Sequence, residues 1–269
     1  MNAIGFILQH TFDYMNKLID QLGLTNHAVA IYRSKTVPED AVSSDIKCGI
    51  PSLLVRCSKS GGKYACCKEQ ISCHGAVGGF GFGGIIDRER TCMSMSHFPP
   101  GSEGNHHGNG KRYFKDPECA GYQINDIPDI GDGNDWIIFQ DLEDAEEIGA
   151  PIDVVVFIVD PTRLTAVMQL ASFSRRTDGP ASIAPFGHAC QQIYAIPYGE
   201  GLKDEPRGVI GMTDMFARRF IEPNELSYAV PYKLYLRMID DIDESFMTQE
   251  RFQEQMMKAL HKNVGLPKF

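Results

Sequence analysis

The sequence predicts an α+β fold in which helices flank a mixed β-sheet. Between residues 4 and 22, apolar side chains recur every three or four positions, as in a helix with one apolar face. Residues 153–160 contain six consecutive apolar residues, VVVFIV, which form the clearest buried strand in the chain. Pro161 follows that strand and is a residue with which helices often begin. A strand that leads directly into a helix is typical of α/β and α+β proteins.

The first third of the chain gives further elements around this frame. The apolar stripe of residues 4–22 is closed by Gly23, and residues 27–32 predict a short buried strand that ends at the turn around Pro38. Gly61 and Gly62 predict a turn, either between two strands or between a helix and a strand. Phe80 and Phe82 alternate with glycines, a pattern that favours an edge strand.

The segment 95–135 differs in composition from the rest of the chain. It is rich in Gly, Pro, Asn and His, and it shows no apolar period. A long stretch without secondary structure inside a compact domain is usually functional or mobile. We therefore expect a flexible loop or flap inserted within a single domain of residues 1–269.

The remainder predicts alternating strands and helices. Residues 136–139 and 207–212 are expected to be strands, and residues 141–148 a short acidic helix or turn. Apolar residues on one face of residues 162–174 predict a helix. Residues 222–231 are interpreted as the start of a final helical region, which continues over residues 232–243 and 249–261.

The chain also suggests an internal duplication. VAIY and the later SCHGAVGGFGFGG resemble, in order, VVVFIVD and the later ACQQIYAIPYGEG. On this hypothesis the fold has two related halves, in which Cys73 and Cys190 are equivalent points that face each other.

Composition limits the class of function. The net charge is −9 and basic residues are scattered, which argues against a nucleic-acid surface. The N-terminus lacks the basic region of a secretory signal, and no apolar run approaches the ~20 residues of a membrane span. We expect a cytoplasmic protein whose partner is a small-molecule ligand or an electron-transfer protein, with a homo-oligomer left open.

Five of the eight cysteines lie between Cys48 and Cys73. In a reducing compartment, such thiols are buried apolar side chains, redox groups or metal ligands rather than disulfides. Their clustering is the first indication of a metal.

The order of elements resembles the prokaryotic family called domain of unknown function 169, from about Leu22 to Phe246. The segments that carry the resemblance are LGLTNHAVAIYRSKTVPED, ISCHGAVGGFGFG, DVVVFIVDPTRLTAVMQLASF, RGVIGMTDMFARR and ELSYAVPY, with single cysteines between them. The resemblance implies a cytoplasmic, cysteine-bearing protein without an assigned activity. It places the recurring thiols on Cys57, Cys73 and Cys190 and the recurring arginine on Arg218 or Arg219. The chain departs from the pattern in a longer segment 95–135 and in five further thiols, namely Cys48, Cys66, Cys67, Cys92 and Cys119.

The main hypothesis is an iron–sulfur cluster, for example of the 4Fe–4S type, held by Cys57, Cys73 and Cys190 with or without Cys67. Thiolates are the soft anionic ligands that iron–sulfur clusters require, and zinc is the lesser alternative. The chain has no compact Cys-x2-Cys-x2-Cys run, which opposes this hypothesis.

Two hypotheses without a metal stand beside it. In the first, Gly75, Gly78 and Gly79 let a small anionic metabolite approach the backbone while Arg218 binds its charge. In the second, Cys66, Cys67 or Cys73 is a redox-active thiol. His97, His106 and His107 are also possible ligands for a divalent metal, although a polar loop explains them as well. The sequence names no catalytic residue.

Overall fold

The computed structural model describes residues 17–43, 50–71, 74–80, 88–96, 112–124, 127–128, 130 and 135–261. Residues 17–22 are helical. The strands are β1 (Val29–Ser34), β2 (Val42–Ser43), β3 (Lys63–Cys66), β4 (Trp136–Asp141), β5 (Val154–Val159), β6 (Ser182–Ile183), β7 (Gly208–Gly211) and β8 (Leu226–Pro231). The α-helices are α2 (Ile50–Ser60), α3 (His74–Gly79), α4 (Arg88–Ser96), α5 (Pro117–Ile124), α6 (Leu142–Glu147), α7 (Pro161–Ser172), α8 (Ile196–Gly201), α9 (Tyr232–Asp241) and α10 (Glu250–His261). A π-helix, η2 (Gln191–Ala195), precedes α8, and 3-10 turns lie at η1 (Lys68–Gln70), η3 (Arg218–Phe220) and η4 (Phe246–Thr248).

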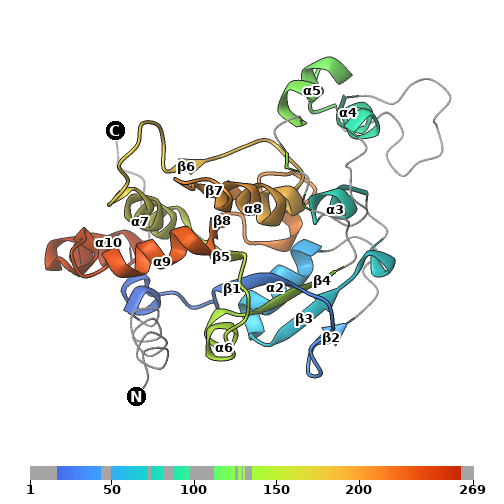
Figure 1. Ribbon diagram of the computed structural model, residues 1–269. Helices are drawn as coiled ribbons and strands as arrows, with labels where there is room; N and C mark the ends of the chain where they lie inside the picture. The colour runs from blue at the N-terminus through green and yellow to red at the C-terminus, as the bar shows by residue number, and fades with distance from the viewer. Residues whose placement is uncertain are drawn as a thin grey trace.

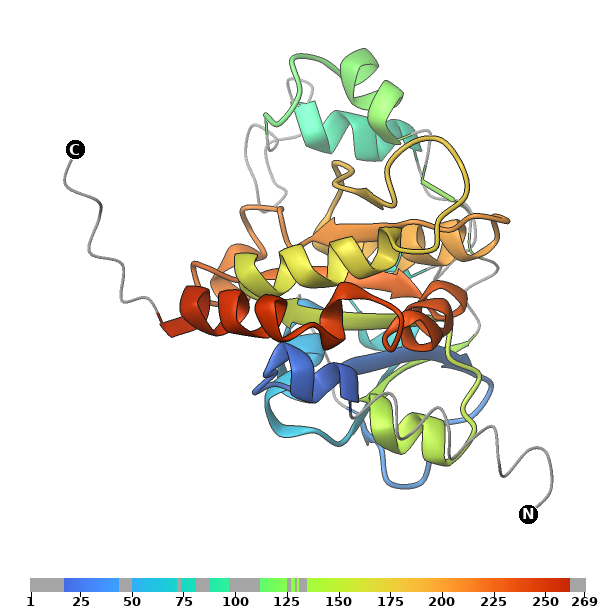
Figure 2. The ribbon, with the colours of Figure 1, turned by 90° about the vertical axis from the view of Figure 1, so that its left-hand side faces the viewer.

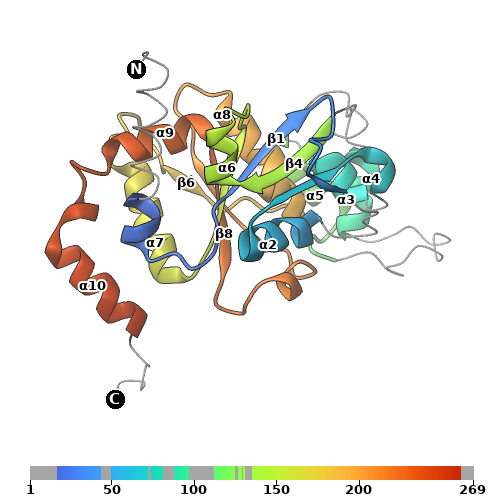
Figure 3. The same cartoon turned by 90° about the horizontal axis from the view of Figure 1, so that it is seen from below.

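The described strands form one mixed sheet, in the order β2-β3-β4-β1-β5-β8-β7-β6, with helices on both faces (Figure 1). Alternate residues of β1 point to opposite faces, so that Val29 and Ile31 join one core and Ala30 and Tyr32 the other. The first core is covered by α2, α3, η2 and α8, and the second by α7 and α9. Figures 2 and 3 show α7, α9 and α10 on one side of the strands, while α4 and α5 lie at the far end of the molecule.

The sheet consists of two halves with the same topology. From the centre outward, β1-β4-β3-β2 and β5-β8-β7-β6 both pair antiparallel, antiparallel and parallel. The antiparallel pairing of β1 with β5 joins them. Matching backbone bonds, from Leu142 N to Ala28 O and from Tyr232 N to Asp153 O, occur in the two halves at 2.9 and 3.0 Å. The predicted α+β fold is confirmed, and its two halves repeat one arrangement.

Most of the predicted elements are present. Gly23 ends the first described helix with a φ of +56°, and β1, β4, α6, β5, α7 and β7 lie where the sequence predicts them. Of the two interpretations of Gly61 and Gly62, the helix-to-strand turn is correct, because α2 precedes it and β3 follows it. Both glycines have positive φ, which favours glycine over other residues.

Three predictions of secondary structure are wrong. The glycine run begins in helix α3, and Phe80 follows that helix in a turn, while Phe82 lies outside the described residues. Residues 226–231 form the interior strand β8 rather than a helix, because β5 and β7 pair with it on either side. The segment 95–135 contains the helix α5. Its mobility, and the assignment of residues 1–269 to a single domain, stay predictions.

The equivalence suggested for Cys73 and Cys190 is also wrong. Cys190 precedes η2, which lies between the second and third strands of its half, β6 and β7. The segment in that place in the first half is α2, whereas Cys73 comes after the third strand, β3. The sequence match is short, and a cysteine near glycines is too common a pattern to fix the alignment.

In the part of the chain that the structure describes, no helix is both long enough and apolar enough to cross a bilayer.

Glu146 lies buried between α6 and α9, where Tyr232 donates a hydrogen bond to its Oε1 at 3.1 Å. Burial raises the pKa of Glu146 to about 7, and the bond from Tyr232 only partly opposes that shift. Because the pKa in the folded chain exceeds the unfolded value, the protonated group favours folding at low pH, and this contribution is lost as the pH rises through about 7.

We therefore expect Glu146→Gln to reduce the loss of stability between pH 5 and pH 8. Between these two pH values, the free energy of unfolding should fall by roughly 2–4 kcal/mol less in the variant than in the wild type. Urea unfolding at the two pH values measures it. The exposed neighbour provides the control, because Glu147→Gln should leave the pH dependence unchanged. Parallel pH profiles for wild type and Glu146→Gln would contradict the assignment.

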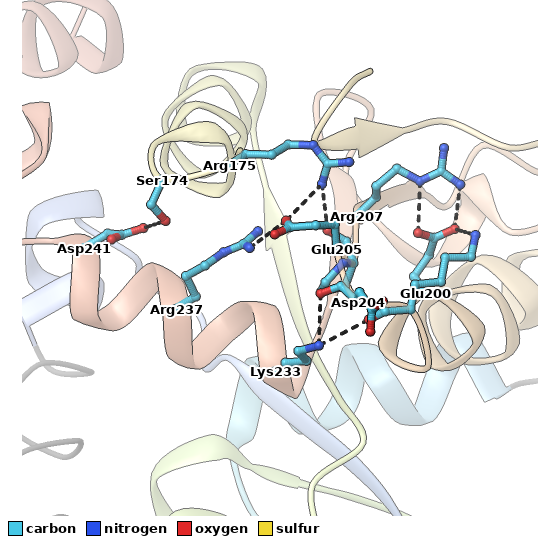
Figure 4. A network of polar contacts seen from close by, with 11 residues as sticks. Ser174, Arg175, Glu200, Asp204, Glu205, Arg207, Lys233, Arg237 and Asp241 are labelled. Carbon is cyan, nitrogen blue, oxygen red and sulfur yellow. Dashed lines mark hydrogen bonds and ion pairs between the residues drawn. The ribbon is translucent and has the colours of Figure 1, made fainter. Parts of the chain in front are cut away.

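A second set of charged residues ties α8 and the following loop to α7 and α9 (Figure 4). Glu200 is nearly buried, and its carboxylate accepts two hydrogen bonds from Arg207, at 2.7 and 2.9 Å, and one from Lys203 at 2.6 Å. Burial by itself would raise the pKa of Glu200, but these bonds lower it below its usual value. Glu205 is more exposed and accepts a hydrogen bond from Arg237 at 2.8 Å.

We expect Glu200→Gln to destabilise the fold at pH 7 by about 1–3 kcal/mol, because Arg207 and Lys203 lose their charged partner. The lowered pKa of Glu200 means that its contribution is present above the usual carboxyl range and disappears as the pH falls through the folded value. The destabilisation caused by Glu200→Gln, measured by urea unfolding, should therefore be smaller at acid pH than at pH 7. Glu205→Gln, at a more exposed pair, should cost about 1 kcal/mol or less. Equal penalties for both variants would refute this ranking.

Candidate functional site

The π-helix η2 is the main irregularity of the fold. Its five residues are buried, and the chain continues from it into α8. The corresponding segment of the first half, α2, is a regular α-helix. A π-helical turn in an otherwise α-helical segment is uncommon and frequently marks a functional site. The side chains around η2 are therefore candidates for such a site.

Glycine lets α3 approach η2 closely. A Cβ atom placed on Gly79 would lie 2.9 Å from Cβ of Cys190 and 3.0 Å from the amide nitrogen of Gln191. Real Cβ atoms do not tolerate the shorter of these distances, so helix packing alone explains this glycine. Gly75 and Gly78 also lie in α3. The cofactor-binding role predicted for the three glycines stays a prediction.

Gln192 fixes two loops against η2. Its buried amide nitrogen donates to Pro185 O at 3.0 Å and to Oγ1 of Thr213 at 2.6 Å, and its oxygen accepts from Thr213 N at 3.1 Å. The neighbouring Met212 is fully buried and has a φ of +58°, a conformation that residues other than glycine seldom adopt. Such strain persists only where the surroundings hold it in place, which happens often at ligand sites.

A polar cluster lies where β1 and β5 meet η2 and α8. This cluster, called the seam cluster below, consists of Arg33, Asp153, Tyr194 and Tyr198. Tyr194 donates to Oδ2 of Asp153 at 2.7 Å, and Nη2 of Arg33 donates to the Tyr198 hydroxyl at 2.6 Å. Nε of Arg33 lies 3.9 Å from Oδ2 of Asp153, and each of these two side chains is about one quarter exposed.

Electrostatics and packing set the properties of the seam cluster. Burial raises the pKa of Asp153, partly opposed by the hydrogen bond from Tyr194 and the charge of Arg33. Burial, followed by the charge of Asp153, raises the pKa of Tyr194 far above its ordinary value, so this phenol stays a donor. Phe80, directly after α3, stacks on the Tyr194 ring with centroids 5.5 Å apart. Phe80, which belongs to the glycine-rich segment, thus packs against the seam cluster and helps to hold Tyr194 in place.

The described residues of segment 95–135 are anchored on both sides of η2. On one side, Tyr113 donates to Oδ1 of Asp214 at 3.0 Å, and Phe114 packs edge-on against Phe186. On the other side, Arg33 Nη1 donates to Ile130 O at 2.9 Å. Gly199 lies so close to Pro128 that a Cβ on it would be 2.7 Å from the proline ring. This part of the segment borders the seam cluster directly.

Three of the predicted metal ligands are among the described residues, and they lie on different elements. Cys57 is fully buried in α2, where its Sγ donates to Gly62 O at 3.5 Å, and Cys190 is buried at the start of η2. Cys67 follows β3 and is partly exposed. In the described part of the chain, no three His, Cys, Asp or Glu side chains form a group that could hold a metal ion. Cys73 lies outside those residues, so a site that includes it stays a prediction.

The structure also bears on the hypothesis of a redox-active thiol, but not on that of histidine metal ligands. Burial raises the pKa of Cys66, and burial together with Glu69 raises the pKa of Cys67, which opposes formation of the reactive thiolate. His97, His106 and His107 lie outside the described residues, so their metal-binding role stays a prediction.

Arg218 makes three hydrogen bonds to backbone. Its guanidinium donates to the carbonyl oxygens of Glu222, Pro223 and Glu225, at 3.1, 2.8 and 2.5 Å. These bonds hold the turn before β8 and give Arg218 a structural role. Its predicted contact with an anion stays a prediction.

The sequence did not single out the seam cluster. Asp153 immediately precedes the buried strand β5, and a charged residue beside a six-residue apolar run was the one available signal. Arg33, Tyr194 and Tyr198 follow or interrupt apolar runs in ways that many structural residues do. Only the sheet order brings residues so distant in sequence together.

We expect Gly79→Ala to destabilise the fold by about 1–3 kcal/mol, because the added methyl group would overlap Cys190. Gly121, in the interior of α5, is the matched control, since the nearest atom to a Cβ there is Sγ of Cys92 at an ordinary 3.9 Å. Gly121→Ala should be neutral or stabilising by up to about 1 kcal/mol. Thermal unfolding compares the two, and a neutral Gly79→Ala would show that α3 does not need its close approach to η2.

Comparison with known proteins identifies the family of this chain but does not indicate an activity. The chain matches no curated protein and no solved structure. Residues 17–241 match the model of the family described as DUF169, uncharacterised ArCR, and this range includes η2 and all four residues of the seam cluster. Since the match covers most of the chain, the protein belongs to the DUF169 family.

Proposed function

We propose that the protein binds a small carboxylate-bearing metabolite at the seam cluster, beside the anchored residues of segment 95–135. The observation that carries the proposal is the incomplete pairing of Arg33 with Asp153. Their nearest charged atoms are 3.9 Å apart and both side chains are partly exposed, so neither charge is sealed in a closed ion pair.

Arg33 has donors to spare for such a ligand. A guanidinium has five N–H donors, and the hydrogen bonds of Arg33 to Ile130 O and Tyr198 use two. Its planar fork matches a carboxylate, and the packing of Tyr198 under the guanidinium, 4.7 Å from its ring centroid, fixes the orientation. A ligand carboxylate therefore has a positioned partner.

Asp153 complements Arg33 as an acceptor. The carboxylate of Asp153 accepts one hydrogen bond from the Tyr194 hydroxyl, at Oδ2, and one from the backbone of Arg33, whereas a carboxylate offers about four lone-pair sites. A ligand ammonium or hydroxyl group on the carbon next to the carboxylate would reach Asp153 while the carboxylate faces Arg33. The ligand class that fits both groups is thus a small amino acid or 2-hydroxy acid.

A panel of small amino acids and 2-hydroxy acids, with L-alanine, L-serine, lactate and glycerate as first members, tests the proposal by calorimetric titration and thermal shift. At least one should bind saturably and raise the melting temperature, because a ligand that binds only the folded state stabilises it. Arg33→Lys should weaken binding about tenfold or more, since Lys has no bidentate fork. Arg56→Lys, on the exposed side of α2, is the matched control and should bind like the wild type. Binding of no panel member, or equal binding by Arg33→Lys, would overturn the proposal.

A second candidate function is a thiolate-held metal or iron–sulfur centre that uses Cys190 and Cys73. Its two thiols flank elements that pack together, since Cys73 precedes α3 and Cys190 precedes η2, although Cys190 itself meets Gly79 at the far end of α3. Iron, zinc and sulfide analysis of protein purified without oxygen distinguishes this function from the first. Cys190→Ser should lose the metal and Cys119→Ser, at an exposed thiol, should keep it. Wild-type protein without metal would exclude the centre and leave the metabolite site unaffected.

A further inference from the structure

A separate hollow lies on the other face of the sheet, away from η2. It has a volume of about 200 Å³ and lies between the segment before β1 and the start of α6. Its wall combines apolar side chains with a histidine and two carboxylates. The residues that line it are Ile19, Leu24, Thr25, Asn26, His27, Ala28, Asp141, Leu142 and Glu143.

The polar part of the wall is a positioned His–Asp pair. Nδ1 of His27 lies 2.5 Å from Oδ2 of Asp141. The other oxygen of Asp141 accepts from the backbone nitrogens of Glu143 and Asp144, at 3.0 and 3.4 Å, and so caps α6. The backbone of His27 is held in turn, because its nitrogen donates to Ser58 O at 2.7 Å. These hydrogen bonds fix the positions of both residues of the pair.

This arrangement sets the role of each imidazole nitrogen. When the neutral ring donates Nδ1–H to Asp141, Nε2 has only its lone pair and can accept a hydrogen bond. Nearly half of the His27 side chain is exposed, whereas only 12% of the Asp141 side chain is. The pair therefore presents an acceptor to the outside with a carboxylate behind it.

The two halves of the fold show that this pair is not needed to build the sheet. The matching backbone bonds align Ala28 with Asp153 and Leu142 with Tyr232. By the same alignment, Ile152 corresponds to His27 and Pro231 to Asp141. The second half forms the same strands and the same helix start with two apolar residues there. The polar pair is an addition to one half only.

The charged side chains that line the hollow indicate the chemical class of its ligand. Two carboxylates, Asp141 and Glu143, and no Lys or Arg are among the lining residues. Within the described chain, no three metal-binding side chains are grouped, which disfavours a metal ion here. We propose that the hollow binds a small aliphatic amine, whose ammonium donates to Nε2 of His27 and is attracted by the two carboxylates, while its carbon chain contacts Ile19 and Leu24.

Titration of the full chain with n-butylamine and putrescine tests this proposal, with 1-butanol as the uncharged probe of similar shape. The amines should shift the NMR signal of the His27 ring saturably, and butanol should do so at least about tenfold more weakly, as expected for the loss of a charge-assisted hydrogen bond. Zn²⁺ is titrated in parallel. A response to Zn²⁺ alone, or to butanol as strongly as to butylamine, would overturn the proposal.

Two variants locate the site. Asp141→Asn keeps a good helix cap, so the fold should survive, but it removes one carboxylate and should weaken amine binding about tenfold. Asp144→Asn, at an exposed position of the same helix, makes the same chemical change outside the hollow and should bind the amines nearly as wild type. If circular dichroism shows that Asp141→Asn is folded, and this variant binds butylamine as tightly as the wild type, the proposed site is refuted.

Discussion

The antiparallel pairing of β1 with β5 joins the two halves of the sheet and holds the fold together. Val29 lies opposite Val156, and Ile31 opposite Val154, at the centre of the sheet. Each half alone would be a four-stranded sheet with a long apolar edge strand, and such an edge is prone to pair with other chains. The pairing covers both edges and produces the continuous surfaces on which the two helix layers pack. It also brings residues of the first and second halves into one site.

The repeated strand arrangement of the two halves distinguishes the features that build the sheet from those found in one half only. Where the two halves agree, as in the strand order and the backbone bonds to Ala28 and Asp153, the residues build the sheet. Where they differ, one half carries polar chemistry that the other half lacks. Arg33 aligns with Ile158, a buried apolar residue, and α2 aligns with a π-helix. Both proposed ligand sites lie at such differences.

The thiols illustrate how tertiary structure changes the meaning of a sequence pattern. Clustering between Cys48 and Cys73 suggests a shared metal, but the described members lie on different elements, with Cys57 in α2, Cys66 in β3 and Cys67 after that strand. Cys57 and Cys66 have no exposed surface, and both contribute to the same apolar core. Burial raises the pKa of both thiols and so favours the neutral form, which packs as a small apolar group.

The elements whose pattern is local can be predicted from the amino-acid sequence alone. The apolar run of β5, the helix start at Pro161 and the glycine turn before β3 follow from periodicity, fixed φ and positive φ, none of which needs a distant residue. The sequence failed at β8 and at α3, because a strand's partners and a glycine's close neighbour are set by chain segments far away. For the same reason, the seam cluster could not be predicted from local patterns: Arg33 and Tyr198 are 165 positions apart, and the order of strands in the sheet brings them into hydrogen-bonding contact.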